Sequence, residues 1–97
     1  MVYLIHFERK LYHAQHYIGF TDVPLIDRVE RHLAGNGSKL LRAVTKAGIE
    51  WEVVRVWQDK DRKFERKLKN QKNSKLLCPI CKIEKYLNEQ PQRHVRP

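Results

Sequence analysis

The sequence has only two cysteines, no long apolar segment and fewer acidic than basic residues, and these shortages exclude several classes of protein. Two cysteines cannot supply a four-cysteine zinc site. No apolar run approaches the roughly 20 residues that span a bilayer. The N-terminal residues alternate in character and soon carry charge, which is not the pattern of a signal peptide. We therefore expect a cytoplasmic protein with no membrane partner and, at 97 residues, a single core.

The two cysteines, Cys78 and Cys81, form one Cys-Pro-Ile-Cys motif. A zinc site needs four ligands, usually from a second such pair or from histidines at a set spacing. The second pair is missing, and His94 is the only histidine near the motif in the sequence. We therefore assign no metal to the motif. A disulfide and a pair of buried thiols remain as alternatives, and an intracellular setting favours the thiols.

The charge of the chain indicates the class of its partner. Lys and Arg number 20 against 11 Asp and Glu, which leaves a formal net charge of +9 at pH 7. A small domain with this excess attracts polyanions, and nucleic acid is the commonest polyanion in a cell. The alternative is a protein that charge merely keeps soluble. Charge alone indicates the class of the partner, but it does not indicate which reaction, if any, the protein catalyses.

Residues 1–21 are expected to form a β-hairpin. Apolar side chains of residues 2–7 fall on both faces of an alternating segment, which is typical of a mostly buried strand. Residues 16–21 form the second strand, after a polar connection longer than a tight turn. Gly19 within that strand indicates a close backbone approach or a bulge.

Two helices follow in the predicted order of elements. Residues 21–24 have the character of a helix start, and residues 35–37, Gly-Asn-Gly, stop that helix. The next helix begins near Ser38 and ends at Gly48. The apolar stripe of the first helix consists of Ile26, Val29 and Leu33.

The C-terminal half is expected to add one strand and two helices. Residues 50–58 predict a strand with Trp51, Val53 and Trp57 on one face. Residues 60–73 form a strongly charged surface helix, and residues 76–87 form a terminal helix with Ile80, Ile83 and Leu87 inward. The pattern predicts an α+β domain on a three-stranded sheet, with one domain over residues 1–88 and a loose tail over 89–97.

Five side chains stand out as candidates for chemistry. Tyr3 and Tyr17 lie on neighbouring strands, Arg28 and His32 are four residues apart on one helix, and Glu65 is surrounded by Lys and Arg. Hydrolysis of a phosphodiester needs a carboxylate for a divalent metal, a fixed guanidinium and a group that orients water. Each residue alone has an ordinary explanation, such as packing, a solvated helix face or an ion pair between Glu65 and Lys69.

The combination of these residues resembles the GIY-YIG nuclease superfamily, in its small stand-alone branch. The matching strings are Val2-Tyr3-Leu4-Ile5, Tyr17-Ile18-Gly19-Phe20-Thr21, Arg28-Val29-Glu30-Arg31-His32, Gly35-Asn36-Gly37-Ser38-Lys39 and Phe64-Glu65-Arg66-Lys67-Leu68-Lys69. The resemblance spans residues 2–75. Met1 stands where the family has the first glycine of its motif. The role of a family asparagine stays open between Asn70 and Asn73.

The resemblance implies a fold and a role for each residue. The implied fold is a three-stranded antiparallel sheet flanked by helices. The implied activity is that of an endonuclease that hydrolyses phosphodiester bonds in DNA with Mg²⁺ or Mn²⁺. Tyr3 and Tyr17 would line the site and touch water or phosphate, and Arg28 would clamp the scissile phosphate. His32 would be a general base or position water, and Glu65 would bind the metal. Gly19 would keep the backbone close to its neighbours.

The partner expected from charge density is the DNA backbone. The candidate contact residues are Lys39, Arg62, Lys63, Arg66, Lys67, Lys69 and Lys72. A chain this small has little surface for reading bases, so a homodimer or a targeting protein is a further expected partner. Two rival functions remain: a non-catalytic nucleic-acid-binding module on the same fold, and a domain that binds an acidic protein.

Overall fold

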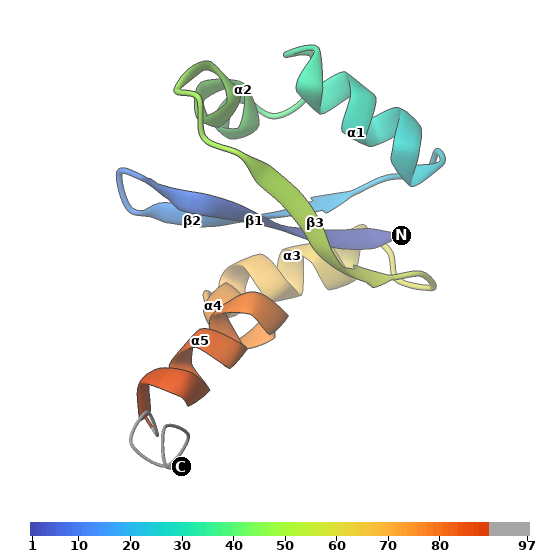
Figure 1. The fold of residues 1–97 in the computed structure, drawn as a ribbon. Coiled ribbons are helices and arrows are strands. Elements are labelled where there is room, and N and C mark those ends of the chain that lie inside the picture. Colours follow the sequence, from blue (N-terminus) through green and yellow to red (C-terminus); the bar gives the residue numbers. More distant parts are fainter. Residues whose placement is uncertain (90–97) are drawn as a thin grey trace.

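A three-stranded antiparallel sheet forms the middle layer of the fold (Figure 1). The computed structural model describes residues 1–89, without the side chains of residues 84–86, 88 and 89. The sheet has the order β2-β1-β3 and contains β1 (Val2–Leu11), β2 (Ala14–Phe20) and β3 (Trp51–Trp57). One face carries α1 (Leu25–Leu33) and α2 (Lys39–Lys46), and the other carries α3 (Arg62–Gln71), α4 (Ser74–Leu77) and α5 (Pro79–Glu89). The predicted α+β architecture is confirmed.

The central strand β1 has its side chains buried on both faces of the sheet. Tyr3, Ile5 and Phe7 pack with residues of α2 in one apolar cluster. Val2 and Leu4 pack on the opposite face with Ile18, Leu68 and the two cysteines. The alternation in the sequence predicts this division because successive side chains of a strand point to opposite faces.

The hairpin differs from the predicted one. β1 continues to Leu11, and the turn consists only of Tyr12 and His13 between the paired Leu11 and Ala14. Tyr12 has a φ of 56°, which a two-residue hairpin turn requires. The expectation of a longer connection was wrong because residues 8–10, although charged and exposed, belong to the strand.

Helix α1 presents a different face to the sheet from the one the apolar stripe predicts. Ile26 and Leu33 are 63% and 58% exposed, whereas His32 is completely buried. The prediction of an inward Ile26–Leu33 stripe was therefore wrong. The helix starts after Pro24 without a side-chain cap, and the Thr21 hydroxyl instead accepts from the Val23 amide. The hydrogen bond of His32 to the sheet explains the rotation.

A β-bulge in β3 changes which residues share a face. Leu4 pairs with Arg55 and Ile5 pairs with Val53, so Val54 is an extra residue in the ladder. As a result Trp57 packs on the face of Val54, and Trp51 packs with Val53 on the other. The predicted face shared by Trp51 and Trp57 was therefore wrong.

The expected terminal helix is two helices, α4 and α5, separated at Cys78. Pro79 follows directly, and a residue before proline is disfavoured in helical geometry. Ile83 and Leu87 are 60% and 50% exposed, so they do not point inward as predicted. Helix α5 continues through Glu89, the first residue of the expected tail, and residues 90–97, with His94, lie outside the described residues. No helix in this described range has the length and apolar character to cross a membrane.

Candidate active site

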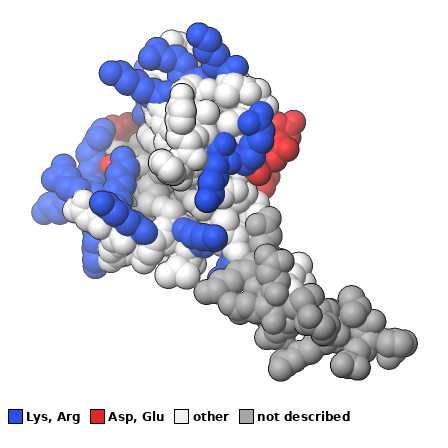
Figure 2. All heavy atoms as spheres, turned by 90° about the vertical axis from the view of Figure 1, so that its left-hand side faces the viewer, with Lys and Arg blue, Asp and Glu red and all other residues white. Residues whose placement is uncertain are grey.

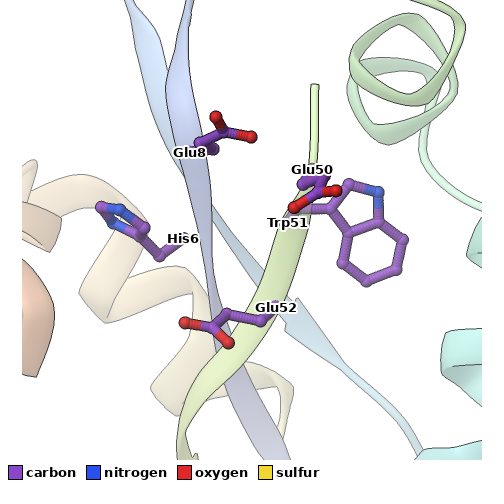
Figure 3. A pocket seen from close by; sticks show the side chains of 5 residues that line it. All are labelled: His6, Glu8, Glu50, Trp51 and Glu52. Atoms are coloured by element: carbon purple, nitrogen blue, oxygen red, sulfur yellow. The ribbon is translucent and has the colours of Figure 1, made fainter. Parts of the chain in front are cut away.

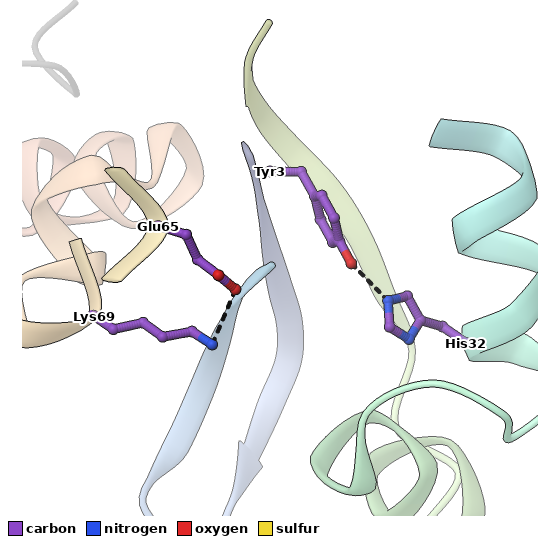
Figure 4. Close-up of polar contacts among 4 residues, drawn as sticks. All are labelled: Tyr3, His32, Glu65 and Lys69. Carbon is purple, nitrogen blue, oxygen red and sulfur yellow. Dashed lines mark hydrogen bonds and ion pairs between the residues drawn. The ribbon is translucent and has the colours of Figure 1, made fainter. Parts of the chain in front are cut away.

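A buried hydrogen bond joins the sheet to α1 and forms the centre of the candidate site (Figure 4). The Tyr3 hydroxyl oxygen lies 2.7 Å from Nε2 of His32. Both side chains have no exposed surface. A buried histidine on a helix needs a polar partner, and the central strand provides it.

The second ring nitrogen of His32 fixes the direction of this hydrogen bond. The backbone N–H of Ser38 lies 3.4 Å from Nδ1 of His32 and can only donate. Nδ1 is therefore the acceptor, so a neutral imidazole carries its proton on Nε2. It follows that His32 donates to the Tyr3 oxygen, which leaves the phenol proton of Tyr3 for another acceptor.

Gly19 allows the Tyr3 ring to cross the neighbouring strand. The two residues are partners in the β1–β2 ladder, and a Cβ on Gly19 would lie 2.4 Å from a Tyr3 ring carbon. Tyr17 lies on the same side, with ring centroids 6.2 Å from Tyr3 and 5.6 Å from His32. The missing side chain at position 19 therefore brings the two tyrosines and the histidine together.

Arg28 adds a positive charge to this group from one turn earlier in α1. Its guanidinium interacts with the hydroxyl groups of Tyr3 and Tyr17. The Nε of Arg28 is buried and has no acceptor within residues 1–89. A guanidinium with an unused N–H is suited to an anionic ligand such as phosphate.

The environment sets the protonation of Tyr3 and His32. Burial raises the pKa of Tyr3 to about 12, although the neighbouring Arg28 opposes this increase. Burial, with the charge of Arg28, lowers the pKa of His32 to about 4. At neutral pH the phenol is protonated and the imidazole is neutral, which agrees with the direction of their hydrogen bond.

Glu65 reaches the same group from the opposite layer of the fold. Its carboxylate, on α3, is 15% exposed and forms a 3.1 Å ion pair with Lys69 (Figure 4). The Lys69 ammonium lies 5.6 Å from the centroid of the Tyr17 ring, and the charge of Glu65 contributes to the raised pKa of Tyr3. The structure thus brings together Tyr3, Tyr17, Arg28 and His32. Glu65 is connected to this group through the contact of Lys69 with the Tyr17 ring and through the longer-range effect of its charge on Tyr3.

The predicted DNA-contact residues are all exposed, and they divide between two layers. Figure 2 shows many Lys and Arg side chains on one face of the molecule, with the largest acidic patch at its right-hand edge. Lys63, Arg66 and Lys67 line a shallow groove along α3. Arg62, Lys69 and Lys72 belong to the same helix or follow it, whereas Lys39 starts α2 on the opposite face of the sheet.

A separate pocket between β1 and β3 is acidic (Figure 3). Glu8, Glu50 and Glu52 line it together with His6 and Trp51. Carboxylates repel a phosphate backbone, so this pocket does not extend the basic surface. The candidate nucleic-acid contacts therefore remain the basic residues of α3, those that follow it and Lys39.

The sequence-based interpretation missed Gly37, which positions His32. A Cβ at position 37 would lie 2.0 Å from Nδ1 of His32. The Gly-Asn-Gly segment was interpreted as a helix stop and as part of a turn that resembles the family's, and nothing local in the sequence shows that a ring rests on its last glycine. The close approach makes Gly37 a positioning residue for the Tyr3–His32 hydrogen bond.

Replacing Gly37 by Ala is expected to displace the His32 ring and to lower the free energy of unfolding by about 1–3 kcal/mol, the usual cost of overpacking. Urea denaturation measures this change. In a His32→Ala background the ring is absent, so the same glycine substitution should cost much less. Equal costs in both backgrounds would show that the ring does not resist a side chain at position 37.

The sequence-based interpretation also missed a group of four metal-ligating side chains. His6, His16, Cys78 and Cys81 have their ligand atoms within 4.8 Å of one another. The two histidines lie in the hairpin, far from the cysteines in the sequence, so proximity along the chain does not indicate them. The Cys-Pro-Ile-Cys motif is the sequence signal of this group.

Comparison with known proteins identifies a family model that matches most of the chain. The family model described as the GIY-YIG catalytic domain matches residues 1–77, which includes all five candidate residues of the site. No curated protein and no solved structure matches the chain.

Proposed function

The chain belongs to the GIY-YIG family, and from this membership and the geometry of the site we propose that it is a metal-dependent endonuclease that hydrolyses phosphodiester bonds in DNA. Membership indicates a nuclease. The observation that supports the fuller proposal is the Tyr3–His32 hydrogen bond beside Arg28, whose Nε has no acceptor in residues 1–89. A module that only binds DNA has no need of this buried arrangement.

Each residue has a role that follows from its exposure or from its hydrogen bonds. Arg28 and Tyr17 are partly exposed and would meet the phosphate first. Tyr3 would orient the attacking water through its hydroxyl group, whose oxygen already accepts from His32. Both ring nitrogens of His32 are engaged, by Tyr3 and by Ser38, so His32 would hold Tyr3 rather than contact water. His32 is therefore a positioning residue in this proposal.

The chemistry of Glu65 suits a hard cation. One partly exposed carboxylate with water completing the shell is the kind of site that Mg²⁺ occupies, and Mn²⁺ accepts the same donors. Lys69 would have to leave the carboxylate for a cation to bind. A bound cation would stabilise the charge that develops on the phosphate.

The surface of α3 would hold the DNA backbone through charge. Its contacts would be independent of base sequence, and binding would weaken steeply as salt increases. We place the nuclease domain at residues 1–88 and the tail at 89–97. Target choice would come from a second copy of the chain or from a targeting protein.

The test of this proposal is a Tyr3→Phe substitution in a plasmid-nicking assay with Mg²⁺ or Mn²⁺. Removing a single hydroxyl is expected to lower the nicking rate by about 10²-fold, because the group that orients the attacking water is lost. Tyr12→Phe is the matched control, since Tyr12 is 88% exposed in the hairpin turn. Equal rates in the natural chain and the Tyr3→Phe variant would contradict the role of Tyr3.

A second candidate function is supported by the ion pair of Glu65. Its 3.1 Å contact with Lys69 is the ordinary arrangement of two charges four residues apart on a helix, and a non-catalytic DNA-binding module would retain it. A natural chain that retards DNA in a gel but leaves plasmid intact with either cation would favour this alternative.

A further inference from the structure

Four side chains from both ends of the described chain meet beneath the hairpin. His6 lies on β1, and His16, its partner in the ladder, lies on β2. Cys78 separates α4 from α5, and Cys81 lies in the first turn of α5. His6, Cys78 and Cys81 are buried, and His16 is half-buried. The two histidines and the two cysteines therefore converge on one point, although the pairs in contact are separated by 65 to 75 positions in the sequence.

Four of the six separations between the ligand atoms match the edges of a tetrahedron, and all six are within 4.8 Å. Nδ1 of His6 lies 3.4 Å from Nε2 of His16 and 3.4 Å from Sγ of Cys78. Sγ of Cys81 lies 3.7 Å from the same Nδ1 and 3.3 Å from Nε2 of His16. Zinc bonds of about 2.3 Å to sulfur and 2.0–2.1 Å to nitrogen imply edges of roughly 3.3–3.8 Å in a tetrahedral site.

We propose that His6, His16, Cys78 and Cys81 bind one zinc ion in a closed structural site. Two thiolates and two imidazoles in tetrahedral array are a donor set that zinc prefers. A disulfide would use the two sulfur atoms but would give no reason for two imidazole nitrogens to face the same point. Four protein ligands leave no open position for a substrate, so the ion would support the fold rather than take part in the reaction.

The ion would fasten α4 and α5 to the β1–β2 hairpin. His6 points to the face of the sheet opposite Tyr3, so the zinc site lies across the sheet from the Tyr3–His32 hydrogen bond. The two cysteines also lie just beyond residues 1–77, which the family model covers. The zinc site is thus an attachment for the C-terminal helices, separate from the cation proposed at Glu65.

The test measures the metal content of the full chain, purified under reducing conditions without chelator. We expect about one zinc ion per chain. Exchange with Co²⁺ should produce the visible absorption of a tetrahedral ion together with thiolate-to-cobalt charge transfer. Chelation should lower the melting temperature, and added Zn²⁺ should restore it.

Substitutions in the hairpin provide matched variants. His16→Asn should bind zinc much more weakly, whereas His13→Asn changes an exposed histidine of the turn and should retain about one ion. Glu65→Ala should also retain the zinc, which separates this site from the proposed catalytic cation. The Co²⁺ titration of the natural chain keeps the test independent of whether His16→Asn folds. A reduced, folded chain that holds no zinc and gives no thiolate-to-cobalt absorption would overturn the proposal, as would stoichiometric iron.

Discussion

A Glu65→Ala chain is expected to leave supercoiled plasmid intact under conditions in which the natural chain nicks it with Mg²⁺. Glu65 is the carboxylate among the five candidate residues, and its side chain is accessible enough to take a cation in place of Lys69. Loss of the cation removes several kcal/mol of stabilisation of the phosphate charge, which corresponds to roughly 10³–10⁴-fold in rate. Densitometry of supercoiled and nicked plasmid over time measures the change.

The same variant is expected to bind DNA as well as the natural chain. The basic residues of α3 remain, and the substitution removes one negative charge from their surroundings. An ion pair between helix residues four positions apart contributes only about 0.3–0.5 kcal/mol to stability, so the fold should persist, which circular dichroism checks. Glu30→Ala, on the exposed side of α1, is the matched control and should cleave normally. Nicking by Glu65→Ala at the natural rate would exclude the metal role, and loss of gel retardation in a folded variant would indicate a binding role instead.

The sequence predicts the sheet well because residues 2–7 of β1 form a nearly continuous apolar run, which is typical of a strand that is buried on both faces. It predicts helix orientation poorly, as α1 shows. Ile26 and Leu33 form a convincing stripe, yet one buried hydrogen bond from His32 outweighs them and turns the helix. Long-range polar contacts of this kind leave no periodic signal in the local sequence.

The bulge in β3 is a second feature that the sequence pattern does not predict. Alternation assigns faces only while the ladder is regular, and a single extra residue exchanges every face beyond it. Trp57 therefore lies opposite to its predicted position, although the strand itself is where the sequence places it.

The candidate site also contains residues that the sequence indicates and residues that it does not. Tyr3 and Tyr17 come from one hairpin, and Arg28 and His32 from one helix, so short spacings indicate each pair. The zinc ligands give no such signal, because His6 and His16 are in the hairpin and the cysteines are more than 60 positions away. The sequence does not indicate the role of Gly37 either, since only the position of the His32 ring explains why this residue has no side chain.

The free energy of unfolding is expected to fall as the pH is lowered from 6.5 to 4, in large part because of His32. Burial lowers the pKa of this imidazole from 6.5 to about 4, so within this range the unfolded chain binds a proton that the folded chain does not. Acid therefore favours unfolding, and the loss levels off below pH 4, where both states are protonated. The shift corresponds to about 3 kcal/mol. Urea denaturation at a series of pH values measures this loss.

Comparison with His32→Asn isolates this contribution. The variant loses the hydrogen bond to Tyr3 and is expected to be less stable at pH 7, but its stability should depend less on pH between 6.5 and 4. His16 is present in both chains, so its contribution cancels in the difference. The two curves should therefore approach each other as the pH falls, since acid destabilises only the chain that has an imidazole to protonate at position 32. Parallel curves would mean that His32 takes up its proton equally easily in the folded and unfolded chains. The assignment of His32 as a neutral hydrogen-bond donor to Tyr3 would then be wrong.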